Sequence, residues 1–201
     1  MKIPALWQKL VEIFLEKNSH INLSAIRESE WVYIKHILDS IQPSEIDFLD
    51  NLFMRAQSML DIWTWWWFPL LPLAQKYPHL ACHGLDARKK KTVAVQDIAT
   101  QYWLKNVVLH RWRAEDKKLK LWKFDLVTAR WVTYADQLFQ WCFRHTKRKG
   151  RMIRRKQFTY EEDAMIVELS NDQRIIDYKT FDYTLPWQEW VKRRVYCMQK
   201  R

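Results

Sequence analysis

Residues 58–69 read Ser-Met-Leu-Asp-Ile-Trp-Thr-Trp-Trp-Trp-Phe-Pro, and this stretch decides how the chain is interpreted. Residues 58–62 form a short apolar run of the kind found in buried strands. Tryptophan follows at positions 63, 65, 66 and 67. If these positions are read as glycine, a strand runs into a glycine-rich loop. In α/β proteins such a loop meets nucleotide-type cofactors, because glycine permits tight turns and close approach of the backbone to the ligand.

The composition points the same way. The chain has 201 residues with 13 tryptophans and only 2 glycines, whereas a globular protein of this length has about 14 glycines at average usage. Our hypothesis is that many tryptophans mark glycine sites, as happens when a codon read as glycine in the source is translated as tryptophan. The alternative is that the tryptophans are real and form an exposed aromatic cluster for contact with a membrane or partner.

The hydrophobic pattern predicts an α/β fold. Helical spacing over residues 4–17 and 29–41 places two helices before the first strand. Strands and helices then alternate, which indicates a mostly parallel sheet covered by helices. The expected strands are 59–62, 80–85, 107–110, 124–128 and 151–154, and the expected helices are 69–76, 90–102, 135–143 and 160–169. Residues 174–183 and 192–199 are expected to form an antiparallel hairpin that closes the sheet.

The whole chain is expected to be one compact unit. Residues 1–45 would form an N-terminal helical extension, and residues 46–201 a Rossmann-like domain. The longest mostly apolar stretch, residues 62–74, is shorter than the roughly 20 residues of a membrane helix. The N-terminus lacks the features of a signal peptide. We therefore expect a cytoplasmic protein.

The net charge of +11 favours a polyanionic partner, and nucleic acid is the expected one. Basic residues are concentrated in four runs, at 88–91, 117–120, 144–155 and 192–194. A single run of this kind is often only solvated surface. The sequence does not indicate which run binds the polyanion.

The cysteines and histidines do not indicate a metal centre. Cys82, Cys142 and Cys197 are far apart and form no C-x-x-C motif, so we expect buried, reduced thiols. His79, Cys82 and His83 are close in sequence, but His79 and Cys82 would point to opposite faces of a strand. No metal is expected.

Further motifs occur in order along the chain, and together they resemble one family. They are Asn22-Leu-Ser-Ala-Ile-Arg27, Lys35-His-Ile-Leu-Asp-Ser40, Leu60 to Pro69, Leu85-Asp-Ala-Arg-Lys-Lys-Lys91, Trp103-Leu-Lys-Asn-Val107, Arg113-Ala-Glu115 and Phe124-Asp-Leu-Val-Thr-Ala-Arg130. This series resembles the ribosomal RNA small subunit methyltransferase G family, also called glucose-inhibited division protein B. The departures are concentrated at tryptophan. Trp63, Trp65, Trp67 and Trp103 stand where the family has glycine, and Trp112 and Trp187 stand where glycine would fit.

The resemblance implies a class I S-adenosylmethionine-dependent methyltransferase that acts on N7 of a guanine in 16S ribosomal RNA. The implied cofactor is S-adenosylmethionine. The implied partner is 16S ribosomal RNA or the small ribosomal subunit, with no membrane partner and a monomeric enzyme. Guanine N7 carries an available lone pair, so no base has to remove a proton before attack. No catalytic residue is therefore assigned, and we expect alignment and site electrostatics to provide most of the catalysis.

The resemblance also implies the cofactor contacts. They are Trp63, Trp65, Trp67, Phe68, Asp86, Ala114, Glu115 and Arg130. Asp86 follows Trp63 at the spacing at which an acidic residue accepts hydrogen bonds from ribose hydroxyls, although it could equally cap the next helix. Arg130 could bind a carboxylate or phosphate through both nitrogens, or it could form a structural ion pair.

The N-terminal motifs imply the side of the site where the acceptor base approaches. The residues concerned are Asn22, Arg27, His36, Asp39 and Ser40. His36 could equally be a core histidine with satisfied hydrogen bonds.

Two other functions are compatible with parts of this pattern. If the tryptophans are real, their rings would fill the cofactor site and leave an inactive RNA-binding protein. A dinucleotide-dependent oxidoreductase could use the same sheet, but Asp61-x-x-Thr64 and the motifs outside the loop disfavour it.

Overall fold

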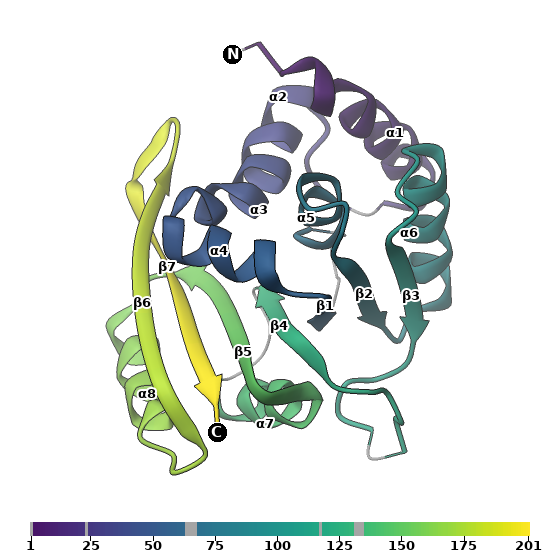
Figure 1. Cartoon of the computed structure of the whole chain (residues 1–201). Coiled ribbons are helices and arrows are strands. Elements are labelled where there is room, and N and C mark those ends of the chain that lie inside the picture. Colours follow the sequence, from purple (N-terminus) through teal and green to yellow (C-terminus); the bar gives the residue numbers. More distant parts are fainter. Residues whose placement is uncertain (1, 23, 63–67, 117, 131–134) are drawn as a thin grey trace.

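The protein is a seven-stranded α/β sandwich in a computed structural model that describes residues 2–201 except 23, 63–67, 117 and 131–134 (Figure 1). The sheet order is β3-β2-β1-β4-β5-β7-β6. The strands are β1 (Ser58–Ile62), β2 (Ala81–Asp86), β3 (Val107–Arg111), β4 (Phe124–Arg130), β5 (Thr146–Gln157), β6 (Ile175–Leu185) and β7 (Gln188–Lys200).

Strands β1 to β5 are parallel, and β7 lies antiparallel between β5 and β6. The first strand, β1, lies inside the sheet. The next two strands, β2 and β3, are added on one side of β1, and β4 is then added on its other side. Ile62 of β1 is in register with Leu85 of β2 and with Ala129 of β4. The carboxyl ends of the central strands therefore meet at one edge, where open α/β sheets bind ligands.

The described helices cover both faces of this sheet (Figure 1). They are α1 (Ala5–Ile21), α2 (Ser29–Val32), the π-helix η1 (Tyr33–Leu38), α3 (Asp39–Ile41), the 3₁₀-helix η2 (Gln42–Glu45), α4 (Asp47–Arg55), α5 (Leu70–Lys76), α6 (Lys89–Gln101), α7 (Ala135–His145) and α8 (Tyr160–Ser170). None of these helices is both long and apolar enough to cross a membrane.

Side-chain alternation along the strands creates two apolar cores. Met59 of β1 belongs to the core under α1, η1, α4, α5 and α6, whereas the next residue, Leu60, belongs to the core under α7 and α8. Successive residues of a strand point to opposite faces, so each central strand serves both cores. The N-terminal helices share the first core with the sheet, since Phe14 of α1 and Ile98 of α6 are both fully buried in it.

The predicted fold class is confirmed, but three details differ. The expected helix over 29–41 is interrupted by η1, and helix α4 was not predicted. Strand β5 begins at Thr146 rather than at 151, because its first residues are rich in lysine and arginine and do not read as a buried strand. The long strand is stabilised by pairing with β4 on one side and β7 on the other.

Candidate active site

The candidate site lies at the carboxyl edge of the sheet. Asp86 ends β2, Arg111 ends β3 beside it, and Arg130 ends β4. Strand β1 ends at Ile62 on the same edge. The predicted cofactor positions Trp63, Trp65 and Trp67 follow it in sequence and lie outside the described residues.

A pocket opens beside the ends of β2 and β3. It brings the predicted cofactor residue Asp86 together with two others that are distant from it in sequence, Ala114 and Glu115. Leu85 and Ala114 are buried and give the pocket an apolar surface. Two carboxylates beside such a surface suit a nucleoside, because the base can pack on apolar groups while the ribose hydroxyls donate to carboxylate oxygens. The lining therefore offers the kinds of contact that the adenosine part of S-adenosylmethionine would need.

Asp86 is buried and also fixes the backbone around the pocket. Its Oδ1 accepts a hydrogen bond of 2.7 Å from the backbone N–H of Arg88, just before α6. Its backbone oxygen accepts one of 3.1 Å from the N–H of Trp112. Asp86 therefore lines the pocket, and it holds the turn before α6 rather than capping that helix, whose N-cap is Arg88.

Arg130 makes an ion pair with Asp39 from the N-terminal helices. Its Nη2 also donates to the backbone oxygen of Lys35 at 2.8 Å. The carboxylate of Asp39 accepts from the Tyr183 hydroxyl at 2.9 Å and lies 3.4 Å from Nε of Arg193. The sequence left two interpretations of Arg130, a ligand contact or a structural ion pair. The structure shows the ion pair, with Asp39.

His36 and Phe68 form the second contact between the N-terminal helices and the site. Their rings stack with centroids 4.9 Å apart, and the edge of Phe14 packs against both. The Nε2 atom of His36 lies 3.1 Å from Oγ of Ser24. Burial lowers the pKa of His36 to about 3, and the positive charge of Arg130 acts in the same direction. His36 is therefore neutral, and it is a core residue that contacts a predicted cofactor residue.

The other N-terminal residues support local structure. Ser40 donates its hydroxyl hydrogen to the backbone oxygen of His36, one turn earlier. Arg27 donates to the side chain of Asn22 at 2.6 Å and to the backbone oxygen of Ser24. Asn22 and Arg27 thus hold the loop after α1, whereas His36 and Asp39 reach Phe68 and Arg130.

Sequence reasoning missed three residues around Asp39. Tyr183 and Arg193 come from the C-terminal hairpin, and Arg155 lies beside Arg130 in β5. Nη1 of Arg155 donates to the backbone oxygen of Ser40 at 2.7 Å. No site role was predicted for these residues, because it is the pairing of distant strands that brings them close to Asp39.

Two tryptophans occupy backbone conformations that favour glycine. Trp103 has φ of 63° and follows the C-cap of α6. The N–H of Leu104 donates to the oxygen of Ala99, and the N–H of Trp103 donates to that of Thr100. These bonds define a Schellman motif, in which the residue at the position of Trp103 is usually glycine. The Trp103 side chain is left 76% exposed.

Trp187, in the C-terminal hairpin, also has a positive φ. Pro186 and Trp187 connect β6 to β7 in a two-residue turn, with Leu185 paired to Gln188. The φ of Trp187 is 58°. Proline followed by a residue with positive φ is the arrangement of a type II turn, where glycine is strongly preferred at the second position. Trp7, in contrast, is buried in the core on α1.

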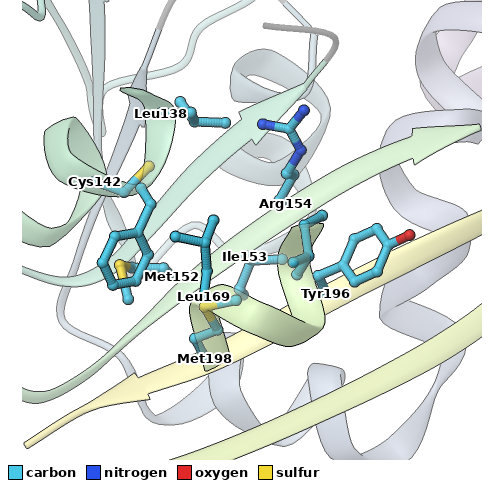
Figure 2. Close-up of a pocket in the computed structure, with 10 residues that line it drawn as sticks. Leu138, Cys142, Met152, Ile153, Arg154, Leu169, Tyr196 and Met198 are labelled. Atoms are coloured by element: carbon cyan, nitrogen blue, oxygen red, sulfur yellow. The ribbon is translucent and has the colours of Figure 1, made fainter. Parts of the chain in front are cut away.

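A second pocket lies away from the carboxyl edge, between the sheet and helices α7 and α8. Its lining is mostly apolar and includes Cys142, Met152 and Met198 (Figure 2). Arg154 contributes to the wall, but it forms an ion pair with Glu162 of α8. With a volume of about 40 Å³, the space is too small for a cofactor. We interpret it as a packing gap in the second core.

Comparison with known proteins identifies the family. The sequence profile of rRNA small subunit methyltransferase G matches residues 4–177. The chain belongs to this family. Ribosomal RNA small subunit methyltransferase G of Exiguobacterium sibiricum is 30% identical over 97% of this chain and 82% of its own length. The protein of that name from Lactobacillus helveticus is 33% identical over 71% of this chain and 60% of its own length.

A solved methyltransferase has the same fold as this member of the methyltransferase G family. The O-methyltransferase from Bacillus cereus, solved in complex with SAH, has a TM-score of 0.64 and 15% identity, and the match covers 96% of this chain and 91% of that one. The predicted family and class I methyltransferase fold are confirmed. The predicted methyltransferase activity on ribosomal RNA and the S-adenosylmethionine cofactor are those of the family.

Proposed function

We propose that this protein transfers a methyl group from S-adenosylmethionine to N7 of a guanine in 16S ribosomal RNA. The observation that carries the proposal is the pocket shared by Asp86, Ala114 and Glu115 at the carboxyl edge of a methyltransferase G sheet. In this proposal the protein acts in the cytoplasm as a monomer, with ribosomal RNA or the small subunit as its partner.

The described residues divide the cofactor contacts between two sides of the site. On one side, Asp86 would accept hydrogen bonds from the ribose, and Leu85 and Ala114 would pack against the adenine. On the other side, Phe68 and Arg130 are held by the N-terminal helices. When bound, S-adenosylmethionine supplies an electrophilic methyl group on a positively charged sulfur.

The residues on the acceptor side suit transfer from a cation to a neutral base. His36 is neutral, and Arg130 is paired with Asp39, a carboxylate that it shares with Arg193. Neither residue places an unpaired charge where the positive charge of the sulfonium disappears during transfer. Guanine N7 has no proton to lose, so the protein has to align the base and exclude water rather than supply a general base.

We also propose that the native protein carries glycine at 63, 65, 66, 67, 103 and 187. The positive φ values of Trp103 and Trp187 support this assignment independently of the family resemblance. Each tryptophan ring has a surface of roughly 150 to 250 Å², which would obstruct a loop that must approach the cofactor. Glycine at these positions would permit positive φ and leave room for the ligand.

The second candidate function, an inactive RNA-binding protein, applies if tryptophan is present at 63, 65 and 67 in the native protein. Peptide mass spectrometry of the protein from its native source distinguishes the two. Glycine in the peptide spanning residues 58–69 would support the enzyme, whereas tryptophan would contradict our assignment.

Activity is tested with two proteins of 201 residues. The tryptophan form has the printed sequence, and the glycine form carries glycine at 63, 65, 66, 67, 103 and 187. We expect only the glycine form to bind S-adenosylmethionine by calorimetry and to produce 7-methylguanosine in unmethylated 16S rRNA, measured by mass spectrometry of the digested RNA. Binding of NADH instead would indicate the oxidoreductase.

A further inference from the structure

The basic residues of this protein fall into two classes that the sequence does not distinguish. Some are neutralised by ion pairs with nearby carboxylates, and others are exposed without such a partner among the described residues. Only the second class can offer its full charge to a polyanion. If the protein acts on RNA as proposed above, the exposed cations of the second class mark the surface that binds it.

The C-terminal run at 192–194 belongs to the neutralised class, and so does part of the run at 144–155. Lys192 pairs with Asp182, Arg193 with Asp39, and Arg194 with both Asp163 and Asp182. In β5, Arg151 pairs with Asp177, and Arg154 pairs with Glu162. These residues stabilise the hairpin and the helix α8 and contribute little free positive charge.

The runs at 88–91 and 117–120 contain exposed cations without ion pairs among the described residues. Arg88, Lys89 and Lys90 are exposed where β2 leads into α6. Arg111 ends β3, and Lys118 and Lys120 follow in the next loop, all three exposed. In the described part of the chain, none of these six forms an ion pair with a carboxylate. We call them the basic edge.

The acidic residues nearby do not cancel this charge. Asp86 and Asp116 each accept a backbone hydrogen bond, from Arg88 at 2.7 Å and from Lys118 at 2.8 Å. Glu115 lies 3.4 Å from Nη1 of a different arginine, Arg113. The side chains of the basic edge therefore remain available to external phosphates.

The basic edge adjoins the candidate active site. Arg88 lines the pocket that contains Asp86, and Arg111, Lys118 and Lys120 line a neighbouring groove that shares Trp112 with it. Strand β3 is separated from β4 by two strands, which corresponds to about 14 Å between them at normal strand spacing. An RNA molecule bound at the basic edge can thus also reach the end of β4.

We propose that the basic edge binds backbone phosphates of the RNA segment next to the target guanine. Exposed lysine and arginine side chains bind phosphates largely without regard to sequence. The bound segment is held beside the pocket, and the target base enters at the end of β4. The basic edge therefore determines affinity for RNA, whereas the pocket determines affinity for the cofactor.

The test compares two double variants with the same loss of charge. The edge variant is Lys118→Gln/Lys120→Gln. The control variant is Lys105→Gln/Arg148→Gln, which removes two exposed cations, before β3 and near the start of β5, that also lack an ion pair among the described residues. Both are made in the glycine and tryptophan forms, and equal thermal unfolding temperatures establish that each variant folds.

The readout is the Kd for a 16S rRNA fragment at several salt concentrations. We expect the edge variant to bind about tenfold more weakly at 0.1 M salt and the slope of log K against log[salt] to become shallower by about 1.5, as for loss of two phosphate contacts. The control variant should keep both values. Equal losses in the two variants, or an unchanged edge variant, would overturn the proposal.

Two further measurements separate this proposal from its alternatives. Affinity for S-adenosylmethionine in the glycine form should be unchanged in the edge variant, and a parallel loss would show instead that the pocket was damaged. Binding to vesicles containing phosphatidylglycerol, with no binding to RNA, would overturn the proposal in favour of a membrane. If RNA binding depends on the basic edge but no methylation occurs, the proposed activity fails and the RNA surface stands.

Discussion

The imidazole of His36 stacks on the phenyl ring of Phe68, with 12° between the ring planes. His36 belongs to the π-helix η1, and Phe68 lies six positions after the last residue of β1, just before α5. The same helical segment supplies the backbone oxygen of Lys35 to Arg130. One short N-terminal segment thus holds two predicted cofactor residues. π-Helical turns are frequently found at functional sites, and this one is consistent with that tendency.

Replacing Phe68 with leucine should weaken both packing and cofactor binding. The substitution keeps an apolar side chain but removes the ring contacts with His36 and Phe14. We expect a loss of about 1 kcal/mol in the free energy of unfolding, typical of an aromatic pair. Urea denaturation measures this loss, and calorimetry on the glycine form should show weaker binding of S-adenosylmethionine. Unchanged cofactor affinity would argue against a role for Phe68 in the site.

Stability should decrease as the pH falls below 6.5. Burial lowers the pKa of His36 to about 3 and holds the pKa values of His83 and His145 at about 4. Below pH 6.5 the unfolded chain binds protons at these histidines while the folded chain does not, so protonation favours unfolding. Each such histidine contributes a loss of up to about 1.4 kcal/mol per pH unit until its folded pKa is reached.

This prediction is checked by urea denaturation between pH 8 and pH 5. His36→Gln should make the decrease in unfolding free energy with falling pH less steep. His20→Asn is the matched control, because His20 is exposed, and it should leave the pH dependence unchanged. An identical pH dependence in both variants would show that His36 is not held neutral by burial.

Asp39→Asn should destabilise the protein strongly. The carboxylate is 2% exposed and faces Arg130, Arg193 and the Tyr183 hydroxyl. Its removal leaves buried guanidinium groups without their counter-charge, which typically costs about 3 to 5 kcal/mol. Tyr183→Phe removes one hydrogen bond and should cost only about 1 kcal/mol. Similar unfolding free energies for the two variants would contradict this role of the Asp39 charge.

Glycine should be tolerated at some tryptophan positions and not at others. Trp103→Gly and Trp187→Gly relieve a left-handed backbone conformation, worth roughly 1 kcal/mol each, and remove side chains that are at least half exposed. We expect each to raise the unfolding temperature by a few degrees. Trp7→Gly removes a buried ring from α1 and should cost about 3 to 5 kcal/mol. Destabilisation by all three substitutions would contradict the glycine assignment at 103 and 187.

The sequence predicted the sheet well because its central strands are short apolar runs separated by helical patterns, as at Met59–Ile62 and Leu80–Leu85. It also placed Asp86 and Glu115 at ends of neighbouring strands, and the structure brings them to one pocket. The partners of Asp39 were not predictable. Tyr183, Arg193 and Arg155 reach it through pairing between distant strands, and nothing in their local sequence records that pairing.

The surface charge illustrates a second limit of the sequence. The run at Lys192–Arg194 and the run at Arg88–Lys90 look equally basic in sequence. Carboxylates from β6 and α8 neutralise Lys192 and Arg194 only after the chain has folded. Free positive charge is therefore a property of the folded surface and not of the local composition.

The left-handed backbone at Trp103 bears on our proposal that this position is glycine in the native protein. In our proposal the native chain ends α6 with glycine, the residue that most often takes this conformation after a helix, and the hydrogen bonds around Leu104 are those of that motif. A positive φ at a tryptophan can therefore indicate a position where the codon specifies glycine in the source organism. Genes from the same genome should show the same mismatch, with tryptophan at helix ends and tight turns that demand positive φ, wherever that codon is translated by the wrong table.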